Sequence, residues 1–172
     1  MIENKNGIEN IHFCVLVPTY NNERTLQTAL AGVLTQTPHV IVVNDGSTDS
    51  TSTILDQFKD EIKRIDFPVN KGKGKALRVG FEQAIKDGFD YVITIDSDGQ
   101  HFPTDIPLFV EKAKLSPNSV LMGSRNMNQA GVPAKSSFGN KFSNFWFWLE
   151  TGIKLPDTQT GFRLYPLQKL KK

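Results

Sequence analysis

Two aspartates separated by one residue are the clearest chemical feature of this sequence. Asp96 and Asp98 follow the apolar run Tyr91–Ile95 in the segment YVITIDSDGQH. Residues two apart on an extended chain point to the same side, so both carboxylates can face one ligand. Carboxylate pairs beside a phosphate commonly hold Mg²⁺ or Mn²⁺. Gln100 could add an oxygen ligand and His101 a nitrogen, although an Asp-rich turn uses the same residue types.

A divalent cation at this place would suit the breaking of a sugar–phosphate bond. The reaction builds negative charge on the departing diphosphate, and a cation that bridges the diphosphate oxygens neutralises this charge. No protein nucleophile is then required. We therefore predict Mg²⁺ or Mn²⁺ as the cofactor of this site.

Three other polar segments have residue types that can bind a nucleotide. VPTYNNE offers Tyr20 for stacking on a base or ribose and Glu23 as a hydrogen-bond acceptor, and VNDGSTD offers Asp45 as another acceptor. The basic, glycine-rich run NKGKGK, residues 70–75, can present N–H groups and lysines to phosphate. Each segment could also be an ordinary turn. Neither a Walker A motif nor a Gly-x-Gly-x-x-Gly after the first apolar run is found, which argues against a P-loop enzyme or a dehydrogenase.

The surrounding sequence predicts the elements that would position these segments. Short apolar runs alternate with segments of helical spacing, which is typical of an α/β fold with a mostly parallel sheet covered on both faces. The strands are expected over 11–17, 40–43, 62–67, 91–95 and 120–122. The helices are expected over 23–34, from 49 or 50 to 59, 74–86 and 103–114. The polar segments follow Val17, Val43 and Ile95, where open parallel sheets bind ligands.

Composition narrows the class of protein. The 172 residues carry 20 basic and 18 acidic side chains, a net charge of +2, so we expect no nucleic-acid partner. The one cysteine, Cys14, lies in an apolar run and is expected to be a buried thiol; with no second cysteine, an intrachain disulfide is excluded. No apolar run approaches the roughly 20 residues that cross a bilayer. We expect a single domain over 1–172, cut at its C-terminus from a longer protein.

Six segments together resemble a known enzyme family. VPTYNNE, VNDGSTD, NKGKGKAL, DSDGQH, GSR and DTQTGFR occur in this order between about Val15 and Arg163. They resemble the inverting family 2 glycosyltransferases, especially the dolichyl- and polyprenyl-phosphate mannose and glucose synthases. One such segment is a weak signal, but six in order with matching spacing are specific. The resemblance implies a GT-A fold, in which a Rossmann-like nucleotide-binding half is joined to an acceptor-binding region.

The resemblance also implies roles for individual residues. The nucleotide-sugar pocket would be lined by Pro18, Tyr20, Glu23, Asp45, Lys75, Asp96 and Ser97. The metal ligands would be Asp96, Asp98 and Gln100. Arg125 would contact phosphate or acceptor. Asp157 and Arg163 would lie across the sugar from the metal and would act in catalysis together with Asp98. The partners would be a nucleoside diphosphate sugar, linked to UDP or GDP, and a lipid-phosphate or glycan acceptor.

The acceptor determines the proton chemistry. A phosphate monoester has a second pKa near ~6 and is already a nucleophilic dianion at neutral pH, so it needs cations such as Arg125 and Arg163 but no base. A sugar hydroxyl needs a general base, for which Asp157 is the candidate. The aromatic segment 136–152 would suit either a membrane surface or contact with further chain. We expect the protein to be cytoplasmic, and we expect the full-length protein to lie at the cytoplasmic face of a membrane.

Two other classes compete with this interpretation. A nucleotidyltransferase also uses a Rossmann-like sheet and a metal-held nucleotide, but it usually has a glycine-rich loop with Arg and Lys after its first strand, and PTYNNE has no glycine. A non-catalytic nucleotide-sugar-binding protein is the second alternative. The presence of both Asp96 and Asp98 argues against it.

Overall fold

The computed structural model describes residues 11–123 and 160–169. The strands of this part are β1 (Phe13–Thr19), β2 (Val40–Asn44), β3 (Lys63–Asp66), β4 (Tyr91–Thr94), β5 (Leu121–Met122) and β6 (Arg163–Pro166). The α-helices are α1 (Leu26–Leu34), α2 (Thr51–Asp56), α3 (Lys73–Lys86) and α4 (Ile106–Leu115). Short 3₁₀ turns at Pro103–Asp105 and Leu167–Lys169 precede α4 and follow β6.

The described strands form one six-stranded sheet in the order β3-β2-β1-β4-β6-β5. The first four strands in this order are parallel. β1 lies between β2 and β4, and its Val15 is in register with Val40 of β2 and with Ile93 of β4. β6 is antiparallel to both of its neighbours, β4 and β5. The mostly parallel sheet that the sequence predicts is therefore confirmed, with an antiparallel pair added at one side.

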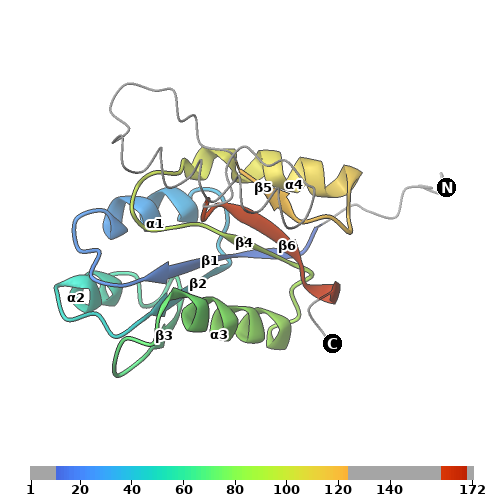
Figure 1. Ribbon diagram of the computed structural model, residues 1–172. Helices are drawn as coiled ribbons and strands as arrows, with labels where there is room; N and C mark the ends of the chain where they lie inside the picture. Colours follow the sequence, from blue (N-terminus) through green and yellow to red (C-terminus); the bar gives the residue numbers. More distant parts are fainter. Residues whose placement is uncertain (1–10, 124–159, 170–172) are drawn as a thin grey trace, which may run out of the picture.

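Helices cover both faces of the sheet, as alternating strands and helices predict. Figure 1 shows α3 on one face and α1 and α4 on the other. Along β1, Val15 and Val17 pack with α1 and α4, whereas Cys14 and Leu16 pack with α3, because successive strand side chains point to opposite faces. Cys14 is fully buried, as the sequence predicts, and this burial raises the pKa of its thiol to about 12.

The predicted elements are present, but several of their bounds differ. The first strand does not end at Pro18 but continues to Thr19. Proline lacks an N–H group, yet it is tolerated here because β4 pairs with β1 only as far as Leu16↔Thr94. Helix α1 begins at Leu26 and not at Glu23, since the residues before it make loop contacts.

The strand β6 was not predicted. Arg163–Pro166 pairs with both β4 and β5, and its side chains alternate between buried and half-buried. This strand directly follows Gly161 and Phe162, so it carries the GFR segment along the side of β4. In the described part of the chain, no helix is long and apolar enough to cross a membrane.

Candidate functional site

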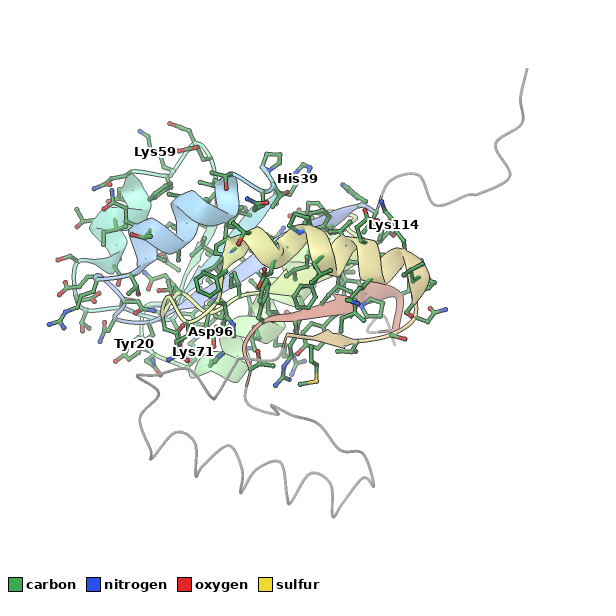
Figure 2. The ribbon with its side chains drawn as sticks, turned by 90° about the horizontal axis from the view of Figure 1, so that it is seen from above. Tyr20, His39, Lys59, Lys71, Asp96 and Lys114 are labelled. Carbon is green, nitrogen blue, oxygen red and sulfur yellow. The ribbon has the colours of Figure 1, made fainter. Side chains whose placement is uncertain are left out.

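An open cavity of about 270 Å³ lies at the carboxyl ends of β1, β2 and β4. This is the place where parallel α/β sheets bind ligands. The cavity is lined by Pro18, Thr19, Tyr20, Asn22, Asp45, Asn70, Lys73, Ala76, Asp96, Ser97 and Asp98. Figure 2 shows Tyr20, Lys71 and Asp96 at one end of the molecule and His39 and Lys114 at the other.

Asp45 brings a buried carboxylate to the cavity from the end of β2. Asp45 is 3% exposed, and its Oδ1 accepts a hydrogen bond of 2.7 Å from the N–H of Lys71. Gly46 follows with φ +70°, and a Cβ there would collide with the backbone of Val69 and Asn70. A side chain is therefore excluded at Gly46, and the close approach holds the NKGKGK loop against Asp45.

Ser97 connects the Asp-Ser-Asp segment to the first loop, residues 20–25, which follows β1. Its hydroxyl accepts a hydrogen bond of 2.6 Å from Nδ2 of Asn22, and its carbonyl accepts one of 2.6 Å from the hydroxyl of Thr25. Ser97 is 2% exposed, so these bonds satisfy groups that have little access to water. Ser97 therefore positions Asp96 and Asp98 relative to the first loop.

Hydrogen bonds also join the first loop to the second loop, residues 45–50, and to the start of α2. The Asn22 N–H donates to the Thr51 hydroxyl at 2.9 Å, and the Thr48 N–H donates to Asn21 at 2.8 Å. Glu23 accepts from the N–H of Ser50, the residue before α2, at 3.1 Å. Glu23 thus caps the start of α2 and is not among the residues that line the cavity.

The carboxylate of Asp96 has a neighbour on each side. Lys73, the first residue of α3, places Nζ 2.6 Å from Oδ1 and 2.7 Å from Oδ2. Gly161 packs against the same carboxylate so closely that a Cβ would overlap it. Asp98 is more exposed, and its Oδ1 accepts a hydrogen bond of 2.9 Å from the N–H of Gln100, the geometry of an Asx turn.

The donor chemistry of these residues fits a hard divalent cation. Within residues 11–123 and 160–169, no three His, Cys, Asp or Glu side chains gather into a complete metal cage. Mg²⁺ is, however, usually bound through one or two carboxylates together with phosphates of the substrate. Asp96 and Asp98 line one cavity and supply that number of carboxylates.

The structure brings together part of the predicted site. The predicted residues that line the cavity are Pro18, Tyr20, Asp45, Asp96, Ser97 and Asp98. Lys75 is exposed and is not among the lining residues, while Gln100 lies two residues beyond Asp98. Arg163 begins β6, where its Nε donates to the Thr160 carbonyl at 2.8 Å. Arg125 and Asp157 lie outside the described residues, as does the aromatic segment 136–152.

Sequence reasoning missed several lining residues. The missed residues are Thr19, Asn22, Asn70, Lys73 and Ala76. The run NKGKGK did indicate a lysine near phosphate, but the lysines at 71, 73 and 75 could not be distinguished by residue type. Asn22 lies in the first polar segment, VPTYNNE, where its residue type is equally typical of a turn.

The sheet and the cavity at its carboxyl edge define a mostly parallel α/β protein, and comparison with known proteins gives the family. The chain belongs to glycosyl transferase family 2, whose model matches residues 14–172. It is 28% identical to the UDP-N-acetylglucosamine–dolichyl-phosphate N-acetylglucosaminyltransferase of Methanococcus voltae, over 91% of this chain and 70% of the relative. It is 26% identical to the polyprenol monophosphomannose synthase of Mycolicibacterium smegmatis, over 92% and 63%.

The solved structures support the same assignment. The chain superposes on a crystal structure of the S. aureus protein TarS in complex with UDP with a TM-score of 0.60. The superposition covers 93% of this chain at 25% sequence identity. The chain spans 48% of that solved chain. The predictions of a GT-A fold and of a glycosyltransferase are thereby confirmed at the level of the family.

Proposed function

We propose that this protein transfers a sugar from a UDP- or GDP-linked donor to polyprenyl or dolichyl phosphate in a metal-dependent, inverting reaction. The observation that carries the proposal is the shared cavity. It collects a buried carboxylate from the end of β2, Asp45, and two carboxylates from the end of β4, Asp96 and Asp98. One nucleoside diphosphate would use both groups, because it has a base and ribose at one end and a diphosphate at the other.

Each group has a separate task in this proposal. Asp45 accepts hydrogen bonds from a base N–H or a ribose hydroxyl, and Tyr20, 47% exposed, offers its ring for stacking. Asp96 and Asp98 would hold Mg²⁺ or Mn²⁺, which when bound neutralises the charge on the departing diphosphate. Ser97 keeps the two carboxylates in place through its buried hydrogen bonds.

The names of the relatives support a lipid-phosphate acceptor. The Methanococcus voltae protein is named for transfer to dolichyl phosphate, and the Mycolicibacterium smegmatis protein is named as a polyprenol monophosphomannose synthase. A phosphate dianion attacks without a general base. A glycan hydroxyl is the second candidate acceptor and would require a base, a role we assign to Asp157. Action at the cytoplasmic face of a membrane belongs to the same proposal.

Calorimetric titration with UDP and with GDP, each with and without Mn²⁺, tests the donor site. We expect one of the two nucleotides to bind in a metal-dependent manner to the wild-type protein, and at least about tenfold more weakly to Asp98→Ala, a loss of about 1.4 kcal/mol. Asp60→Ala removes an exposed carboxylate outside the cavity and should bind like the wild type. Failure of both nucleotides to bind the folded protein would overturn the donor assignment.

A further inference from the structure

Lys73 and Asp96 form an ion pair across the cavity between elements that are distant in sequence. Lys73 begins α3, whereas Asp96 follows β4, and both side chains line the cavity. The ammonium group lies within hydrogen-bond distance of both carboxylate oxygens, 2.6 Å from Oδ1 and 2.7 Å from Oδ2. Lys73 therefore neutralises Asp96 at the place where the proposed function requires a divalent cation.

The stability of α3 does not explain a lysine at this position. The N-terminus of a helix carries a partial positive charge, so a cation in the first turn is unfavourable there. The first turn of α3 contains no acidic residue, and Lys71, Lys73 and Lys75 are all exposed. Positive charge is therefore concentrated beside the cavity, and the Asp96 carboxylate offsets part of it. A diphosphate in the cavity would offset more, because it carries several negative charges.

Of the two partners in this ion pair, Asp96 is held more tightly than Lys73. Gly161 packs directly against the carboxylate, so the Asp96 side chain has no free space on that side. The Asp96 side chain is 21% exposed, whereas Lys73 is 53% exposed and sits on a flexible stem. The lysine is thus the partner that can move. A divalent cation and the ammonium would compete for the same two oxygens and would repel each other.

We propose that Lys73 is an internal counter-cation that occupies Asp96 until the diphosphate of the donor draws it away. In the donor-free protein, the ammonium competes with the metal for Asp96. When the diphosphate binds, Lys73 gains a more highly charged partner, and Asp96 becomes available to the cation. Metal and nucleotide then favour each other's binding by the same factor, as coupled sites must. This inference rests on the proposed function.

Manganese binding in the absence of nucleotide tests the competition directly. Electron paramagnetic resonance of free Mn²⁺ gives the metal affinity of the wild type, Lys73→Met and Lys71→Met. We expect Lys73→Met to bind Mn²⁺ about tenfold more tightly than the wild type, within the usual range of coupling between sites. Lys71→Met removes the same charge from the same NKGKGK run. The Lys71 ammonium lies 5.2 Å from the Phe67 ring centroid, and this variant should stay close to wild type. The double variant Lys73→Met, Asp96→Asn should lose the gain.

A second titration adds UDP or GDP to the same proteins. Nucleotide should tighten Mn²⁺ binding strongly in the wild type and clearly less in Lys73→Met. Circular dichroism and thermal unfolding verify that each variant is folded, and Lys73→Gln replaces Lys73→Met if the latter is not. If neither nucleotide binds, the proposed function fails, yet the metal-only comparison still decides the role of Lys73. Mn²⁺ binding that is equal or weaker in Lys73→Met, or undetectable in both proteins, would overturn the inference.

Discussion

Gly161 is a sterically constrained residue beside the cavity. It lies against the Asp96 carboxylate, and an added Cβ would overlap both carboxylate oxygens. No positive φ is involved at this glycine, so the constraint comes from space alone. The GFR segment therefore acts on the cavity through the absence of a side chain at 161, in addition to any role of Arg163.

We predict that Gly161→Ala weakens nucleotide binding in the presence of Mn²⁺ by at least about tenfold, or about 1.4 kcal/mol. The added methyl group must push the Asp96 carboxylate away from its present position. Calorimetric titration measures the effect. Gly74→Ala is the matched control, because a Cβ at Gly74, in the first turn of α3, meets nothing within 4 Å. Equal nucleotide affinity in both variants would contradict the role given to Gly161.

At the scale of elements, an ion pair joins the edge strand β3 to the end of α3. Lys63 on β3 donates to both carboxylate oxygens of Asp87, the C-cap residue of α3, at 2.6 and 2.7 Å. Gln83 donates to the same carboxylate at 2.8 Å. Burial alone would raise the pKa of Asp87, but the hydrogen bonds from Lys63 and Gln83 outweigh burial and lower the pKa below its usual value.

We predict that Lys63→Met lowers the free energy of unfolding by about 0.2–1 kcal/mol at pH 7, the range for exposed pairs, since Lys63 is 49% exposed. Because the pKa of Asp87 is lower in the folded than in the unfolded protein, its ionised carboxylate stabilises the fold at pH values above its pKa in the unfolded chain, about 3.9. This contribution is lost as the pH falls through the pKa of Asp87 in the folded protein. The difference between the two proteins should therefore shrink below about pH 4. Urea unfolding at several pH values measures it, with exposed Lys59→Met as the control. A difference that does not depend on pH would exclude the Asp87 contribution.

At the scale of the whole molecule, the cavity joins segments from four loops that are distant in sequence, the loops that follow β1, β2, β3 and β4. Hydrogen bonds connect Asn22 to Ser97 and to Thr51, and another connects Lys71 to Asp45. The loops are thus organised before a ligand arrives. A ligand that binds this folded arrangement and not the unfolded chain must stabilise the entire fold.

We predict that the nucleotide that binds raises the unfolding temperature in the presence of Mn²⁺. At a concentration about 100 times Kd, the stabilisation is about 2.7 kcal/mol, which corresponds to roughly 5–10 °C for a chain of this size. Thermal unfolding followed by circular dichroism measures the shift. Asp98→Ala at the same nucleotide concentration should show a much smaller shift. Equal shifts in both proteins would place the nucleotide away from the Asp96–Asp98 pair.

Much of this protein was predictable from its sequence because the signals are local. Apolar runs and helical spacing indicated the elements of the parallel sheet, and the polar segments after Val17, Val43 and Ile95 indicated one ligand edge. Their meeting around Asp45, Asp96 and Asp98 follows from the rule that parallel strands share a carboxyl edge.

Three features were decided by the tertiary structure alone. The pairing of β6 with β4 joins segments that are far apart in sequence, and four residues of alternating burial carry too weak a local signal to predict it. Lys73 and not Lys75 meets Asp96, because the start of α3 sets the direction of each lysine. Glu23 caps α2 because its loop packs against the next one. Residue type and spacing determine which groups are available, whereas the contacts between distant segments determine which of these groups meet.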